Sequence, residues 1–146
     1  MNERIIDFLF IAKKTVYEGN GTEVKSSKPL SHDFEYTKED LKLINSHLGN
    51  DNFAGQEVLC ENNIPVWSMN YVGRIIGPDF SCDFLKEALS LISKEKPFRG
   101  PREHKNSAYL YKCEIKGNIG WFYGFEEIFF NDIKVYEYAF HGGILK

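Results

Sequence analysis

Three glutamates stand in apolar, aromatic-rich stretches of the sequence, where carboxylates are unusual. Glu57 lies in FAGQEVLCE (53–61), and Glu126 and Glu137 lie within the stretch 120–141. A carboxylate in apolar surroundings takes a raised pKa unless a cation neutralises it. These glutamates are therefore candidates for recognising a cationic ligand or for acting as a general base.

Two predicted β-hairpins carry these acids. The first joins strands 53–61 and 64–72 through Asn62-Asn63, and the second joins 120–130 and 133–141 through Asn131-Asp132. Asparagine and aspartate tolerate the positive φ angles of a type I′ turn. Pro65 indicates a sheet edge or a local irregularity in its strand.

Counting outward from two-residue turns gives the cross-strand partners. Glu126 is then opposite Glu137, and Glu57 is opposite Ser68. Like charges facing each other destabilise a sheet, so this register predicts a shifted pKa or a cation between the two acids. The alternatives are two solvent-facing carboxylates or a register that slips by one residue. In the same register Gly55 and Gly124 face Asn70 and Ala139, and glycines inside strands mark a bulge or a close backbone approach.

Aromatic rings surround these acids, and alternation divides the second hairpin into two faces. Phe122, Glu126, Ile128, Val135 and Glu137 share one predicted face, and Tyr123, Phe125, Tyr136, Tyr138 and Phe140 share the other. The rings suit a concave ligand pocket, a plain core or a dimer interface. The predicted ligand-binding residues are Glu57, Trp67, Asn70, Tyr71, Glu126, Tyr136, Glu137 and Tyr138.

The other residue patterns that could suggest a catalytic or cofactor site do not predict one. Ser31-His32-Asp33 contains the residue types of a catalytic triad, but triad members are neighbours in space rather than in sequence. The histidines lack metal-ligand spacing, and no phosphate-binding glycine loop opens a helix, so we expect neither a metal nor a cofactor. The basic run from Lys94 to Lys105 is predicted to be a solvated loop.

Helical periodicity predicts one helix before each hairpin. Residues 3–17 and 80–94 are predicted helices, with Asn2 capping the first and Asp79 or Ser81 capping the second. Residues 20–32 are a predicted loop. Further strands are predicted at 34–36, 41–48 and 108–115.

The two hairpins align without a gap at an offset of 69 residues. Segment 53–73 matches 122–142 at Phe53/Phe122, Gly55/Gly124, Glu57/Glu126, Asn62/Asn131, Ile64/Ile133, Val66/Val135 and Gly73/Gly142. A helix precedes each set of strands, which predicts an internal duplication. The expected fold is α+β: one domain, 1–146, in which duplicated α-β-β-β units (about 3–76 and 79–146) form an antiparallel sheet packed by two helices about a pseudo-twofold axis.

Composition limits the function classes. The net charge of −3 argues against direct nucleic-acid binding, and no apolar run is long enough to cross a membrane. The N-terminus lacks the pattern of a secretory signal, and Cys60, Cys82 and Cys113 are unpatterned. These features predict a cytoplasmic protein.

The sequence resembles a bacterial family of small uncharacterised domains, found alone or C-terminal to helix-turn-helix regulators. The resemblance rests on the following segments: SHD (31–33), FAGQE (53–57), PVWSMNYVG (65–73), DFLKEAL (83–89), PFRGP (97–101) and VYEYAFHGG (135–143). It implies an effector or sensor domain without an assigned activity. The expected domain fills the 146 residues, leaving no room for a DNA-binding module. The duplicated unit also looks like the effector-binding domains of multidrug-responsive regulators.

The leading hypothesis is a domain that binds a small amphipathic or cationic ligand in an aromatic, glutamate-containing cleft. One alternative is a hydrolase-type enzyme with a glutamate general base. The other is an interaction module, in which the aromatic face forms a homodimer.

Overall fold

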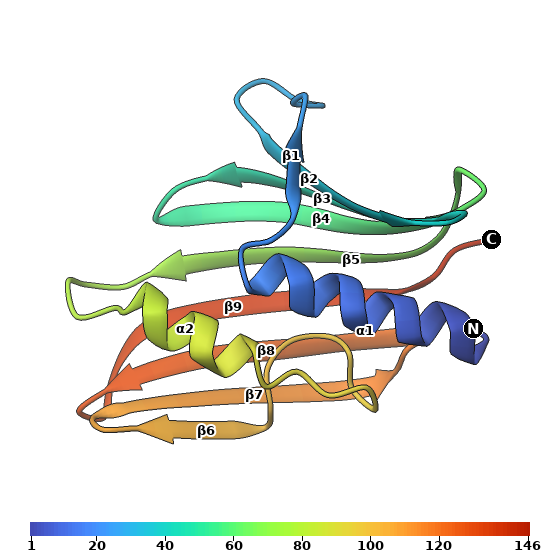
Figure 1. Ribbon diagram of the computed structural model, residues 1–146. Helices are drawn as coiled ribbons and strands as arrows, with labels where there is room; N and C mark the ends of the chain where they lie inside the picture. The colour runs from blue at the N-terminus through green and yellow to red at the C-terminus, as the bar shows by residue number, and fades with distance from the viewer.

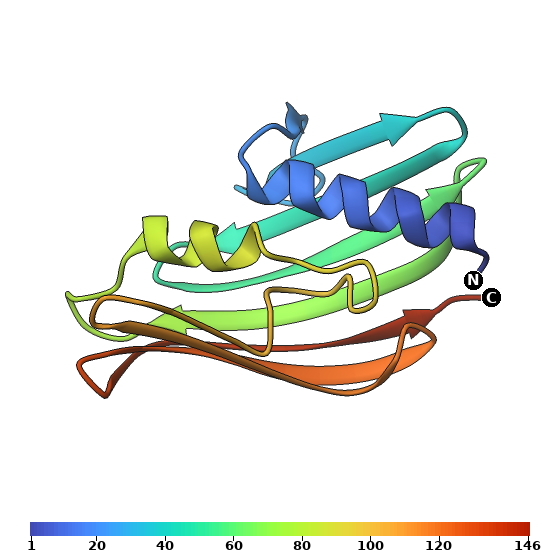
Figure 2. The same cartoon turned by 60° about the horizontal axis from the view of Figure 1, so that its bottom comes forward.

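In the computed structural model, which describes residues 1–146, nine strands form one antiparallel sheet and two helices pack on one of its faces (Figures 1 and 2). The predicted α+β class is confirmed. The strand order is β1-β2-β3-β4-β5-β9-β8-β7-β6. The elements are α1 (Glu3–Tyr17), β1 (Thr22–Val24), β2 (His32–Lys38), β3 (Leu41–Gly49), β4 (Asn52–Glu61), β5 (Ile64–Ile75), α2 (Cys82–Leu89), β6 (Glu103–Asn106), β7 (Tyr109–Asn118), β8 (Trp121–Phe130) and β9 (Ile133–Ile144). We call the helix-covered face of the sheet the helix side and the opposite face the open face.

Helix α1 matches its prediction. The Asn2 side chain caps it by accepting a hydrogen bond from the Ile5 amide at 2.9 Å. One stripe of α1 is buried against the sheet: Ile5, Phe8, Leu9, Ala12 and Lys13. Helix α2 has Ser81, one of the two predicted caps, but it spans Cys82–Leu89 rather than 80–94.

The structure adds two short strands to the predicted set. Strand β1 lies within the predicted loop 20–32, and β6 overlaps the end of the basic run from Lys94 to Lys105. Both lie at the two ends of the strand order. Their sequences, TEV and EHKN, are too short and polar to show the alternation that identifies a half-buried strand.

Both hairpin turns are as predicted, but the registers beyond them are not. Asn62, Asn63, Asn131 and Asp132 all have positive φ angles. A register shift follows in each hairpin, between Leu59 and Cys60 in β4 and between Ile128 and Phe129 in β8. The irregularity predicted at Pro65 is thus present, because Pro65 pairs with Cys60 at the first shift.

These bulges move every later pair by one residue. Glu126 is opposite Tyr138 rather than Glu137, and Glu57 is opposite Met69 rather than Ser68. Gly55 and Gly124 are likewise opposite Tyr71 and Phe140, not Asn70 and Ala139. The like-charged pair across the second hairpin is in fact Glu127 and Glu137. The predicted register was wrong because an extra residue on one strand cannot be counted from the turn.

The same shift reassigns the two faces of the second hairpin, since a slip of one residue reverses every side chain. Tyr136, Tyr138 and Phe140 are buried with Phe122, Glu126 and Ile128 on the helix side. Glu137 lies instead on the open face with Tyr123 and Phe125. The predicted separation of the rings from Glu126 was therefore wrong.

The strand order from β2 to β6 is symmetric about the β5–β9 pair. Tyr71 of β5 is opposite Phe140 of β9, and these residues correspond at the offset of 69. The two bulges also correspond at this offset. Each half contains four strands after its helix, β2–β5 and β6–β9, rather than the three predicted, and β1 is an addition to the first half.

Candidate functional site

Glu57 and Glu126 occupy corresponding positions on β4 and β8, and both point to the helix side. Their exposed fractions are 4% and 0%. Two charges removed from water are stable only when partners satisfy them. Each carboxylate has such a partner, and in each case the partner is a basic residue of the helix layer.

Glu126 is held by four hydrogen bonds. Arg99 donates two of them, from Nε to Oε2 at 3.0 Å and from Nη2 to Oε1 at 2.8 Å. The Tyr136 hydroxyl donates to Oε1 at 2.7 Å, and the Tyr111 hydroxyl donates to Oε2. This two-point pairing of guanidinium and carboxylate is the strong form of a charged hydrogen bond.

Arg99 comes from the segment predicted to be a solvated loop, and that prediction was wrong for residues 97–100. Pro97, Phe98, Arg99 and Gly100 are all buried. The guanidinium carbon lies 4.0 Å from the centre of the Tyr138 ring and 5.2 Å from that of Tyr17. Burial is the largest single influence and lowers the pKa of Arg99, but the Glu126 carboxylate and the neighbouring tyrosines together outweigh it and raise the pKa above its ordinary value.

Lys13 of α1 pairs with Glu57 more loosely. Its Nζ lies 3.0 Å from Glu57 Oε1 and 3.7 Å from the sulfur of Met69. Oε1 of Glu57 has no well-aligned hydrogen bond, so this contact is an ion pair without directional support. Burial lowers the pKa of Lys13, and the Glu57 carboxylate opposes that shift. The Lys13 ammonium also lies 5.7 Å from the ring of Trp67.

The predicted aromatic residues fill the space around these ion pairs. Trp67 stacks on Phe122 at 5.7 Å and donates from Nε1 to the Ile119 carbonyl at 3.0 Å. Tyr71 stacks on Tyr138 at 5.3 Å. We call the following set the buried polar cluster: Lys13, Glu57, Trp67, Tyr71, Arg99, Tyr111, Glu126, Tyr136 and Tyr138.

The buried polar cluster brings together six of the eight predicted ligand-binding residues, but it places them in the core. Sequence reasoning missed Lys13 and Arg99, the cations that neutralise the glutamates. Lys13 follows Leu9 by four residues on the apolar stripe of α1, which is the available signal for its burial. Arg99 stands between Phe98 and Gly100 in PFRGP, and nothing in that segment indicates that a basic side chain turns inward.

The other two predicted residues lie on the open face. The Asn70 side chain accepts a hydrogen bond from Gln56 at 2.7 Å. Glu137 accepts from Arg74 Nε at 2.6 Å and lies 3.4 Å from the ammonium of Lys134. The hydrogen bond from Arg74 is the main cause of a lowered pKa at Glu137, so its carboxylate is an anion at neutral pH.

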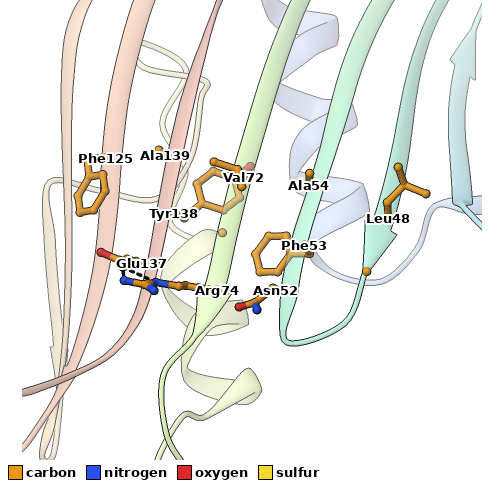
Figure 3. A pocket seen from close by; sticks show the side chains of 12 residues that line it. Leu48, Asn52, Phe53, Ala54, Val72, Arg74, Phe125, Glu137, Tyr138 and Ala139 are labelled. Carbon is orange, nitrogen blue, oxygen red and sulfur yellow. Dashed lines mark hydrogen bonds and ion pairs between the residues drawn. The ribbon is translucent and has the colours of Figure 1, made fainter.

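Glu137 borders a groove of about 700 Å³ on the open face, shown in Figure 3. Apolar residues from five neighbouring strands line it: Leu48, Ala54, Val72, Phe125 and Ala139 point to the open face, and Phe53 and Tyr138, whose rings pack on the helix side, border it. Val72 and Phe125 are 57% and 39% exposed, and with their apolar neighbours in the groove they form a contiguous exposed patch, which marks interaction sites. The Arg74–Glu137 ion pair closes one end of the groove (Figure 3).

The tripeptide Ser31-His32-Asp33 forms a polar contact without being a triad. Asp33 accepts hydrogen bonds from Ser27 at 2.6 Å, Ser31 at 2.6 Å and Ser46 at 3.2 Å. The Ser27 and Ser31 hydroxyls lower the pKa of Asp33 to about 2. The His32 ring pairs with an exposed carboxylate of β1 instead. Asp33 thus fastens the segment before β2 to the sheet.

Two further observations concern ions and membranes. The structure gathers no group of three or more histidine, cysteine, aspartate or glutamate side chains that could hold a metal ion. Neither helix is both long and apolar enough to span a membrane.

Comparison with known proteins identifies one relationship. Residues 45–145 match a family described as a domain of unknown function, DUF5680. No curated protein and no solved structure shows a significant match. The match covers both hairpins and all of α2, and it carries no assigned activity and no association with helix-turn-helix regulators. The predicted kinship with an uncharacterised family is confirmed to that extent, and the chain belongs to the DUF5680 family.

Proposed function

We propose that this domain binds a small amphipathic cation in the open-face groove. The observation that carries the proposal is a groove of about 700 Å³, apolar along its length, with a fixed carboxylate at one end. Ligand pockets typically measure about 300–1,000 Å³ and combine apolar walls with few polar groups. The proposal keeps the predicted ligand class and one predicted anchor, Glu137, and moves the site from the helix side to the open face.

The charged end of the groove favours a cation. The Glu137 side chain is 19% exposed and the Arg74 side chain is 61% exposed. The carboxylate is therefore part of the wall, whereas the guanidinium is largely in water and costs little to displace. A ligand ammonium that replaces Arg74 would place its apolar body along Val72 and Ala54.

Titration with rhodamine 6G, an amphipathic cation, tests the proposal by fluorescence anisotropy. We expect saturable binding that weakens about tenfold in Glu137→Gln, since one partly buried charge pair is lost. Arg74→Ala should bind more tightly because the competing guanidinium is gone. Glu103→Gln removes an exposed carboxylate on β6, outside the groove, and should bind as the unaltered chain does.

Three outcomes would overturn the proposal. One is no saturable binding, another is equal loss in Glu137→Gln and Glu103→Gln, and the third is a preference for the anion anilinonaphthalene sulfonate over rhodamine. Light scattering on the same samples tests the homodimer alternative. A dimer that Val72→Arg converts to monomer would make the groove a subunit interface instead.

The enzyme alternative receives less support from the geometry. It assigned the general base to a glutamate in contact with pocket water. Glu126 has no solvent-exposed surface, and Arg99 and two tyrosines occupy its oxygens. Neither Glu57 nor Glu126 lines the open-face groove.

We also propose that the two halves of the chain arose by duplication. The gapless offset of 69, the corresponding bulges and the central Tyr71–Phe140 pair support this. Superposition of the Cα atoms of 53–73 on those of 122–142, extended to the whole halves, is the test. Halves that superpose only at the turns would overturn it.

A further inference from the structure

A second groove on the open face lies beside an unusual pair of rings. Trp121 and Tyr123 of β8 point the same way, because they are two residues apart on one strand. Their exposed fractions are 78% and 55%, and the next most exposed aromatic side chain, Phe125, is 39% exposed. Two flat rings about 7 Å apart along a strand form a stacking platform rather than a packed core.

The groove beside this platform has a volume of about 330 Å³ and contains no formally charged aspartate, glutamate, lysine or arginine. Besides the two rings themselves, its hydrogen-bonding side chains are Ser68, Asn70 and His141, on the neighbouring strands β5 and β9. The Asn70 carbonyl oxygen is taken by Gln56, which leaves the two amide hydrogens of Asn70 without a partner. These groups could donate to and accept from a ligand's hydroxyl groups.

From this combination we propose that the Trp121–Tyr123 groove is a saccharide-binding site. A pyranose ring presents a flat face of C–H groups, which stacks on an aromatic ring, and a rim of hydroxyls, which bond to amide, imidazole and hydroxyl groups. The uncharged lining matches a neutral ligand. The site is separate from the groove at Glu137, so it does not depend on the function proposed above.

Single-stranded nucleic acid also stacks on exposed aromatic rings, but the charges around the platform do not favour it as the ligand. A phosphate backbone requires several lysine or arginine side chains along its path. The nearest charged neighbours on β7 are Lys116, opposite Tyr123, and Glu114, opposite Phe125. These two charges cancel, so the platform offers no net attraction to phosphate.

The two tryptophans provide an internal reporter for the test. Trp121 is 78% exposed and Trp67 is fully buried, so Trp121 accounts for the longer-wavelength part of the tryptophan fluorescence. A ligand on the platform should change that part alone. We would titrate the protein with cellohexaose, maltohexaose and chitohexaose. The expected result is a saturable blue shift with at least one of these sugars.

Variants measured by calorimetry locate the site. Trp121→Ala should abolish saccharide binding, and Tyr123→Ala should weaken it about tenfold. Trp121→Phe should retain part of it, since a flat ring remains. Phe125→Ala, on the same strand and face but in the other groove, is the matched control and should bind sugars normally. Melting temperatures should not fall with Trp121→Ala, because the removed ring is in water.

The proposal is overturned if none of the three sugars gives a saturable shift, or if binding survives in Trp121→Ala with unchanged affinity. Binding of an oligothymidylate in place of the sugars would overturn it as well, and would assign the platform to nucleic acid. Loss of rhodamine binding in Glu137→Gln has no bearing on these outcomes.

Discussion

Arg99 and Lys13 each supply a positive charge to a carboxylate that the sheet buries, but the two pairs differ in geometry. Arg99 makes two aligned hydrogen bonds to Glu126, and two tyrosine hydroxyls complete the carboxylate's partners. Lys13 makes one ion pair to Glu57 without an aligned hydrogen bond. Removing either cation leaves an uncompensated buried charge, and the more completely bonded pair should suffer the greater loss.

The first prediction concerns that loss. Arg99→Ala should lower the free energy of unfolding by about 3–5 kcal/mol, because Glu126 remains buried without its cation. Replacing both partners, Arg99→Leu with Glu126→Leu, should cost less than Arg99→Ala alone, since no buried charge is then unpaired. Urea denaturation measures both values.

Arg102→Ala is the matched control, because Arg102 lies three residues further along the same segment and is exposed. It should change stability by no more than about 0.5 kcal/mol. Equal effects of Arg99→Ala and Arg102→Ala would contradict the structural role assigned to Arg99.

The second prediction is a pH dependence from Asp33. Its pKa in the folded chain is about 2, below the value of about 3.9 for an unfolded aspartate. A depressed pKa stabilises the fold above about pH 4, and this contribution is lost as the pH falls toward about 2. Unfolding free energy measured across this range should therefore fall less steeply in Asp33→Asn than in the unaltered chain. Parallel curves for the two proteins would show that Asp33 contributes nothing to acid sensitivity.

At the scale of strands, in-strand glycines fit under aromatic rings of the neighbouring strand. A Cβ added at Gly55 would overlap the Tyr71 ring and the Ser46 carbonyl, and one at Gly124 would overlap the Phe140 ring. The sequence predicted a bulge or a close approach at these glycines, and the close approach is what the structure contains. It could not predict which ring is involved, because that depends on the bulged register.

The third prediction follows from this contact. Gly55→Ala and Gly124→Ala should each destabilise the fold by about 1–3 kcal/mol, because backbone atoms as well as rings occupy the space. Gly120→Ala is the control, since its Cβ would lie 3.2 Å and 3.5 Å from movable side-chain atoms of Asn118 and Ile144. A thermal melt in which all three variants lose the same stability would refute the argument.

The same strands show which parts of the fold and of the candidate site the sequence predicts. Turn chemistry at Asn62-Asn63 and Asn131-Asp132 located both hairpins, and the periodicity of residues 3–17 located α1 with its cap. The bulges shifted the register by one residue, and with it the face that the candidate side chains of one strand share with those of the paired strand. Bulges depend on tertiary packing rather than on local composition, so the candidate site was predicted by residue type but not by position.

For the whole molecule, the important observation is that the family match begins at residue 45, beyond α1, β1 and β2. Yet α1 supplies part of the core, Ile5, Phe8, Leu9 and Ala12, and the cation for Glu57. The matched portion alone would therefore expose apolar residues on the helix side of β3 and β4 to water and leave Glu57 without the cation that pairs with it.

The last prediction is that residues 45–146 alone do not fold cooperatively, because removing 1–44 loses both the apolar cover and the charge of Lys13. Circular dichroism should show a broad thermal transition without a cooperative midpoint. Adding a peptide of residues 1–44 should restore the transition, whereas the same peptide with Lys13→Glu should not, since it places two like charges in the core. A sharp transition in the fragment alone would mean that the β4–β9 strands need no helix α1, and that the Lys13–Glu57 pair is dispensable.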